Sequence, residues 1–321
     1  MNQESTTAIN LSGHVRNAPK KRTVWKRYLD NKYFFIMLAP VILYFIIFHY
    51  IPIYGVIIAF ENFKIIKGIT GSPWVGLDNF RDMFSGLYFI PVLKNTFIIN
   101  FYKLLFGFPA PILLAVLLNE IRKPLFKKSV QTITYLPYFL SWIALSGIII
   151  EFLSPSRGPV NVLLNMLGFK PIFFIASVDW FRSILVSTEI WKTVGFNAII
   201  YLAAIAGINP ELYEAADVDG ISKLKKIWYI TLPSISPVIV IMLILTSGQI
   251  INDDFDQIYN LLNAKVSSVG EVISTYTYTE GIQKMNYSYA AAVGLFKNVV
   301  ALVVVLTANF IAKRFSNETI F

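Results

Sequence analysis

The sequence predicts an all-α integral membrane protein with about six transmembrane helices. Of its 321 residues, 55% are hydrophobic and only 15% are charged. Several apolar runs are longer than the roughly 18 residues that mark a membrane helix, and helices satisfy their own backbone polar groups inside a bilayer. The expected spans lie at about 33–54, 96–119, 130–153, 183–206, 232–252 and 290–311.

The distribution of lysine and arginine predicts the orientation of these spans. The apolar run after the basic tail 1–32 is too long for a cleaved signal peptide. With this tail in the cytoplasm, the inner segments hold 16 Lys and Arg residues and the outer segments hold nine. Because cytoplasmic loops carry the excess of positive charge, we expect both 1–32 and 313–321 in the cytoplasm. Anchoring of the tail to the anionic leaflet is favoured over the alternative, nucleic-acid binding.

Two segments between the spans are less regular. Residues 61–95 include Gly71, Pro73 and Gly76, which exclude one continuous helix. Residues 160–175 are apolar but too short and too interrupted to cross a bilayer. For them we expect a helix at the membrane interface or packed against protein.

The polar segment 207–231 separates the fourth and fifth spans. Asn209 is a favourable N-cap, and Pro210 suits the first position of a helix. Gly220 can adopt the left-handed conformation that ends a helix. We therefore expect one helix that ends at Gly220 and a second that begins at Ser222 and is interrupted by Pro233.

This segment also carries a motif. Glu214-Ala215-Ala216 is followed by Asp219-Gly220 and then, at fixed distance, by Leu232-Pro233. The series resembles the EAA loop of ABC importer permeases, with Ile221 and Ile227 where the family usually has Ala and an aromatic residue. In that family the loop is the cytoplasmic coupling helix that docks on the ATPase. The resemblance implies coupling through Tyr213, Glu214, Ala215, Ala216, Asp219, Gly220, Leu232 and Pro233.

Further stretches extend the resemblance over most of the chain, with a family core at about 92–311. They include 50–55, 76–80 and 137–142. They are similar to the oligosaccharide group of type I ABC importer permeases, and above all to permeases of pectin-type (polygalacturonan and rhamnogalacturonan) importers of Gram-positive bacteria such as Bacillus. The resemblance implies the type I permease fold, a plasma-membrane location and complex oligosaccharides as substrate, with pectin-derived, uronate-containing ones as a candidate. Another sugar class is the alternative.

Composition and motifs argue against catalysis by the chain itself. It contains no cysteine and only two histidines, which disfavours thiol chemistry and zinc sites. It has no G-x-x-x-x-G-K-[ST] phosphate loop. We therefore expect no catalytic residue, no metal and no cofactor in this chain, with ATP and Mg²⁺ held by separate ATPase subunits.

Polar residues inside the spans are the candidates for a substrate path, because charge within a bilayer is costly unless it faces protein or water. Acidic, amide and cationic groups suit sugar hydroxyls, and aromatic rings suit the apolar faces of sugars. The candidates are Tyr135, Tyr138, Trp142, Glu189, Trp191, Lys192, Asn197, Gln249, Asn252, Asp253, Asp254, Lys103 and Lys297.

Each candidate also has a plainer interpretation. Tyr and Trp near span ends are typical of the interface belt, and the acidic run 253–256 is also consistent with a solvated loop. Lys192 either snorkels outward or pairs with Glu189. The three intramembrane lysines suit an anionic sugar, or else each pairs with a carboxylate of this chain or its partner.

The implied complex contains this permease, a second homologous permease, two ATPase subunits and an extracellular solute-binding lipoprotein. Either permease is a candidate for the one that contacts the oligosaccharide. A secondary transporter would show inverted repeats with broken helices at the midplane, and a membrane-anchored sensor would carry a soluble output domain. Neither alternative accounts for the motif at Glu214.

Overall fold

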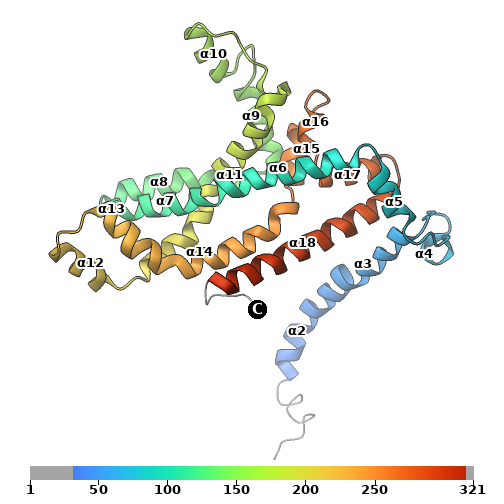
Figure 1. Ribbon diagram of the computed structural model, residues 1–321, viewed down its shortest axis with the longest axis horizontal. Coiled ribbons are helices and arrows are strands. Elements are labelled where there is room, and N and C mark those ends of the chain that lie inside the picture. Colours follow the sequence, from blue (N-terminus) through green and yellow to red (C-terminus); the bar gives the residue numbers. More distant parts are fainter. Residues whose placement is uncertain (1–31, 316–321) are drawn as a thin grey trace, which may run out of the picture. The chain divides into compact units, whose positions relative to one another are not determined.

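The computed structural model describes residues 32–315 of the chain (Figure 1). The described residues are helical apart from turns, loops and one isolated bridge between Glu61 and Trp74. They divide into two compact units, with the boundary after Gly55. Within residues 32–315, five helices are long and apolar enough to cross a membrane, and a sixth crossing arises if one bent pair is counted as a span. The predicted all-α membrane architecture is confirmed.

The described part of the first unit consists of α2 (Lys32–Phe45), the π-helical turn η1 (Ile46–Tyr50) and α3 (Ile51–Ile53). Its large apolar side chains are exposed, as expected of a helix solvated by lipid. Pro52 has no N–H to donate, and a wide turn before a proline is one way in which a membrane helix adapts to that loss. The helical run 33–60 contains the predicted first span.

The boundary falls within η2 (Tyr54–Phe60), and α4 (Gly68–Gly71) and α5 (Asp78–Ser85) follow in the second unit. These short elements agree with the prediction that residues 61–95 do not form one helix. Asn79 donates to the carbonyl oxygens of Ala59 and Glu61 at 2.9 and 3.0 Å. The amide thereby fixes the loop between η2 and α5.

Long helices form the body of this unit. They are α6 (Phe89–Gly107) with α7 (Pro109–Glu120), α11 (Val178–Ala206), α14 (Leu232–Ser247) with η6 (Gly248–Ile251), and α18 (Tyr287–Phe315). Buried Ala115, Ala198 and Tyr201 belong to one core cluster with Ile235, which joins α7, α11 and α14. Gly195 allows α11 to lie against α8, because a Cβ there would lie 2.1 Å from the carbonyl oxygen of Thr134.

The predicted span 130–153 is not a straight helix. The segment contains α8 (Pro124–Tyr135), the 3-10 turn η3 (Leu136–Phe139) and α9 (Trp142–Phe152), and the two arms are bent by 108°. Leu140 and Ser141 are extended, and the Ser141 hydroxyl caps α9 by accepting from the Ala144 N–H at 3.3 Å. Pro137 and the serine cap account for the break, and the predicted span 130–153 falls on this bent pair.

The segment 159–176 carries α10 (Pro159–Met166) and the turn η4 (Phe174–Ala176), and α10 projects away from the long helices (Figure 1). Phe174 and Ile175 are buried in a core cluster with α9 and α11 residues. Asn161 donates to the Ile172 carbonyl at 2.9 Å and accepts from the Ile172 N–H at 2.7 Å. The segment is therefore packed against protein, as one of the two expectations stated.

The polar segment after α11 forms α12 (Pro210–Val218), α13 (Lys223–Lys226) and the π-helical turn η5 (Ile227–Thr231). The Asn209 side chain caps α12 by accepting from the Glu211 N–H at 3.1 Å, and Gly220 has φ +69°, both as predicted. The interruption expected at Pro233 is absent, because the helical run 223–251 passes through it. Pro233 lies in the first turn of α14, next to the wide turn η5, where a missing N–H is accommodated.

Shorter elements link η6 to α18. They are α15 (Phe255–Leu261), α16 (Ser267–Gly270), α17 (Ile273–Tyr278) and the π-helical turn η7 (Thr279–Gln283). Asn95 of α6 donates to the Ser268 carbonyl at 3.0 Å, and Arg182 of α11 donates to the Val269 carbonyl at 3.1 Å. These bonds tie α16 to two long helices.

Candidate functional site

A cavity of about 460 Å³ lies among α6, α7, α11, α14, η6 and the loop 252–254. Seven residues predicted for the substrate path line it: Lys103, Glu189, Asn197, Gln249, Asn252, Asp253 and Asp254. They come from three separate parts of the sequence, and the fold brings them to one wall. The lining therefore combines one ammonium, three carboxylates and several amides.

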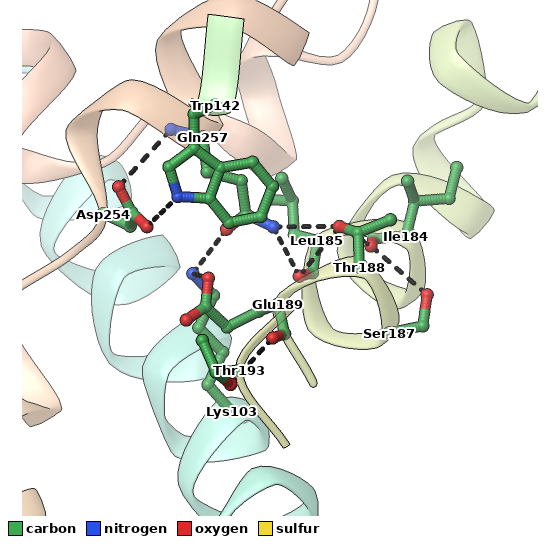
Figure 2. A network of polar contacts seen from close by, with 10 residues as sticks. All are labelled: Lys103, Trp142, Ile184, Leu185, Ser187, Thr188, Glu189, Thr193, Asp254 and Gln257. Atoms are coloured by element: carbon green, nitrogen blue, oxygen red, sulfur yellow. Dashed lines mark hydrogen bonds and ion pairs between the residues drawn. The ribbon is translucent and has the colours of Figure 1, made fainter. Parts of the chain in front are cut away.

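Lys103 and Glu189 meet at this wall, where a network of polar contacts joins α6, α11 and α15 (Figure 2). The Lys103 ammonium donates to Oε1 of Gln257 at 2.6 Å and lies 3.8 Å from Oε2 of Glu189. Gln257 is fully buried, and its Nε2 donates to the Leu185 carbonyl at 2.8 Å and to the Thr188 hydroxyl at 2.9 Å. The glutamine thus holds the lysine in place beside the carboxylate.

Asp254 connects the same network to the broken span. Its carboxylate accepts from the Trp142 indole N–H and, at 3.4 Å, from the backbone N–H of Gln257 at the start of α15 (Figure 2). Trp142 is buried and does not line the cavity. It therefore acts on the cavity wall through Asp254, which differs from the direct sugar contact predicted for it.

Asp253 is paired with Lys297 of α18. The two charged groups lie 3.0 Å apart, and the other Asp253 oxygen accepts from the Ser274 N–H at 2.9 Å. The Asp253 side chain is 0% exposed. Lys297 does not line the cavity, so the predicted alternative, pairing with a carboxylate of this chain, describes its position.

Lys192 is held at the break between η3 and α9. Its ammonium donates to the carbonyl oxygens of Tyr138 and Leu140 at 2.9 and 2.8 Å, and it lies over the rings of Tyr138 and Trp142 at 5.5 and 5.3 Å. Lys192 does not line the cavity. The pairing of Lys192 with Glu189 considered from the sequence was wrong, since the lysine nearest to that carboxylate is Lys103.

Three aromatic candidates lie away from the cavity. Tyr138 stacks on Phe196 with ring centroids 3.9 Å apart, Trp191 is exposed on α11, and Tyr135 lies on α8 where that helix approaches Gly195. Their contacts suit helix packing and the membrane interface. The aromatic members of the lining are Phe108 and Tyr201 instead.

Sequence reasoning missed several residues of the lining, including Asn100, Thr193, Tyr201 and Thr246. A signal was present, because Glu189, Thr193, Asn197 and Tyr201 recur every four residues and so share one face of α11. Asn100 likewise lies one turn before Lys103. Extending each polar candidate along its helix face would have found them.

The residues predicted for coupling form a second site. Glu214, Ala215 and Asp219 are exposed on α12, whereas Ala216 is buried. The Tyr213 hydroxyl lies 2.8 Å from that of Thr231, and Lys226 pairs with Asp217. These contacts hold α12 against η5 and leave an acidic face open. Leu232 and Pro233 lie in the first turn of α14, beyond η5.

No group of three His, Cys, Asp or Glu side chains that could hold a metal ion occurs among residues 32–315. The polar groups of the cavity are instead arranged in pairs and amide-linked contacts. Such a lining can bind a polar molecule through hydrogen bonds, and none of its groups forms a nucleophile–base arrangement.

Comparison with known proteins places this architecture in a family. Residues 107–318 match the model of the binding-protein-dependent transport system inner membrane component. The polygalacturonan/rhamnogalacturonan transport system permease protein YteP of Bacillus subtilis is 42% identical over 302 residues, 94% of each chain. Protein LplB of the same organism is 42% identical over 291 residues, 91% of this chain and 92% of the relative.

Solved structures agree with this assignment. A chain from the crystal structure of a bacterial ABC transporter involved in the import of the acidic polysaccharide alginate matches with a TM-score of 0.85 and 42% identity, over 91% of this chain and 99% of that one. A structure of the alginate transporter with an alginate pentasaccharide-bound periplasmic protein matches with a TM-score of 0.86 and 41% identity, over 92% and 99%. The chain therefore belongs to the family of binding-protein-dependent transport system inner membrane components, as the permease subunit of a type I ABC sugar importer.

Proposed function

We propose that this permease forms part of the translocation path for complex oligosaccharides, including uronate-containing ones, delivered by an extracellular binding protein. The observation that carries the proposal is the cavity of about 460 Å³, whose lining combines Glu189, Asn197 and Gln249 with the Lys103 ammonium. Carboxylate, amide and ammonium groups supply both acceptors and donors for sugar hydroxyls. The names of the relatives, which concern polygalacturonan and alginate, support the substrate class.

The energy for transport would come from two ATPase subunits docked at the coupling segment. Glu214 on α12 and Asp219 at its C-terminal end are both exposed and offer acidic groups for docking. A second, homologous permease would complete the path. Closure of the ATPase pair would move both coupling segments and expose the cavity alternately to the two sides of the membrane.

A reconstituted complex tests this proposal. The permease, its partner permease, the ATPase and the binding protein are placed in liposomes, and uptake of labelled oligosaccharides is measured with and without ATP. We expect ATP-dependent uptake of pectin-type oligosaccharides, and a large loss of uptake when Asn197→Trp fills the cavity. ATP-dependent uptake that is unchanged in Asn197→Trp, at equal membrane abundance, would exclude the cavity as the path.

A further inference from the structure

We infer that the Glu189 carboxylate receives the hydroxyl groups of a sugar unit in the cavity, and that the intramembrane lysines do not receive a uronate carboxylate. The inference deepens the proposed function by naming the part of the substrate that this cavity recognises, and it rests on that proposal. Any uronate charge would then be recognised by the binding protein or the partner permease.

The first step concerns the cations. Lys103 donates to Gln257 at 2.6 Å, Lys192 donates to two carbonyl oxygens, and Lys297 is paired with Asp253 at 3.0 Å. Of these three, only Lys103 lines the cavity, and its side chain is 13% exposed. A uronate would have to compete with acceptors that the fold already holds in place.

The second step concerns the acceptors. Oε2 of Glu189 is buried and has no hydrogen-bond partner in the described part of the chain. Its distance of 3.8 Å from the Lys103 ammonium allows Coulomb attraction but is too long for a hydrogen bond. The Glu189 side chain is 23% exposed and lines the cavity, so a ligand reaches this carboxylate from the cavity side. Because an unmade bond at a largely buried charged group is costly, an O–H group donated to this carboxylate gains more than at an exposed one.

The third step concerns the other polar groups of the lining. Three of them donate to the backbone, and two of these bonds run from the Thr246 hydroxyl to the Met242 carbonyl at 2.7 Å and from the Asn100 amide to the Ile250 carbonyl at 3.1 Å. The Thr193 hydroxyl likewise donates to the Glu189 carbonyl at 2.9 Å. The oxygen atoms of these groups keep free acceptor capacity, which suits hydroxyl donors.

The fourth step concerns net charge. Lys103 faces three carboxylates of the lining, those of Glu189, Asp253 and Asp254, and Lys297 compensates Asp253. Lys192 adds a third cation, over the Trp142 ring that binds Asp254. The three lysines therefore balance the three carboxylates, and no cation is left over to attract a uronate carboxylate. Hydrogen bonds from hydroxyls to an ionised carboxylate are also about twice as strong as neutral ones.

The experiment measures uptake by the whole reconstituted complex. Two substrates are compared: a uronate oligosaccharide, and the same oligosaccharide with its carboxyl groups reduced to hydroxymethyl groups. Both substrates are delivered by the same binding protein. For each substrate, uptake by a variant is divided by uptake by the unmodified permease, which cancels any preference of the binding protein for one substrate. Glu151→Gln is the matched control, because Glu151 is exposed and paired with Arg157 outside the cavity.

We expect Glu189→Gln to lower uptake of the neutral sugar about tenfold, which corresponds to about 1.4 kcal/mol. Glu189→Asp, which keeps the charge, should recover part of the loss. Lys103→Gln should reduce uptake of both sugars by the same factor, because it leaves Glu189 without its counter-ion. The control should not change either rate.

Two results would overturn the inference. One is unchanged uptake of the neutral sugar by Glu189→Gln, and the other is a loss confined to the uronate sugar in Lys103→Gln. Both differ from failure of the proposed function, in which no cavity variant, Asn197→Trp included, changes uptake of any sugar. Thermal unfolding of each variant identifies a misfolded permease, and Glu189→Asp then provides the decisive comparison.

Discussion

Lys192 donates from its ammonium to the carbonyl oxygen of Leu140 at 2.8 Å, at the point where the chain turns by 108° between η3 and α9. A break in a membrane helix leaves carbonyl groups without intrahelical donors, which must be satisfied by protein or water. The same ammonium also serves the Tyr138 carbonyl. The sequence suggested Lys192 as a substrate contact. In the structure, Lys192 instead donates hydrogen bonds to the two carbonyl groups at the break.

Lys192→Met should destabilise the permease, because it leaves two carbonyl groups without their donor. We expect a loss of about 1 kcal/mol in the free energy of unfolding, the usual net contribution of a hydrogen bond. Lys192→Arg should restore part of it. Thermal unfolding in detergent measures the effect, with Lys128→Met on α8 as the control. Equal midpoints for Lys192→Met and the control would contradict this role.

The ends of α12 could be predicted from the sequence, whereas the break between η3 and α9 could not. Of the six predicted spans, five coincide with long helices and the sixth falls on the bent pair. Asn209, Pro210 and Gly220 predicted the ends of α12 from local chemistry alone. The break near Leu140 depends on Pro137 locally but also on Lys192, 52 residues away in sequence. Hydropathy counts apolar residues and does not register such a distant donor.

The polar pairs at the cavity could not be predicted from the sequence for the same reason. Lys103 and Gln257 are 154 residues apart, and Trp142 and Asp254 are 112 residues apart. Residue type identified Lys103, Asp253 and Asp254 as functional candidates. Their partners depend on how α6, α9, α15 and α18 pack together, which no local pattern specifies.

Glu271 predicts a pH dependence of stability. Burial raises the pKa of its carboxyl group, with a further rise from Glu280 and an opposing effect of Lys284. Because the folded-state pKa lies above the unfolded one, the ionised carboxylate disfavours the folded state above the unfolded pKa of about 4.3. Below that pH both states are protonated and the penalty is absent.

Glu271→Gln should therefore raise the midpoint of thermal unfolding at pH 7 and leave it nearly unchanged near pH 4. The amide keeps the size of the side chain and removes the charge. The exposed Glu151 supplies the control, Glu151→Gln, for which no stabilisation is expected. A midpoint that Glu271→Gln lowers at pH 7 would show that the charged form is favoured in the fold.

Substitutions in the coupling segment should weaken assembly with the ATPase without preventing the permease from folding. Gly220 has φ +69°, a conformation that proline cannot adopt and that asparagine tolerates. Gly220→Pro and Glu214→Lys should leave the permease in the membrane but weaken copurification of the ATPase, and Gly220→Asn should retain it. Unchanged ATPase pull-down and unchanged substrate-stimulated hydrolysis in the first two variants would refute the docking role.

The orientation can be tested with single cysteines, because the chain has none of its own. Ser268 and Ser222 are both exposed. Ser72 is less suitable, because its hydroxyl donates to the Gly68 carbonyl at 2.6 Å. In intact cells, an impermeant thiol reagent should label Ser268→Cys and not Ser222→Cys. Labelling of Ser222→Cys from outside would reverse the predicted topology.

Asn197 provides the most direct test of the cavity as the sugar path, because it is exposed and lines the cavity. The measurement is uptake of a labelled oligosaccharide by the reconstituted complex carrying Asn197→Cys, before and after reaction with a small membrane-permeant thiol reagent. The account predicts that modification stops ATP-dependent uptake, that saturating oligosaccharide slows the modification, and that modified Ser268→Cys still transports. Full uptake after complete modification of Asn197→Cys would contradict it.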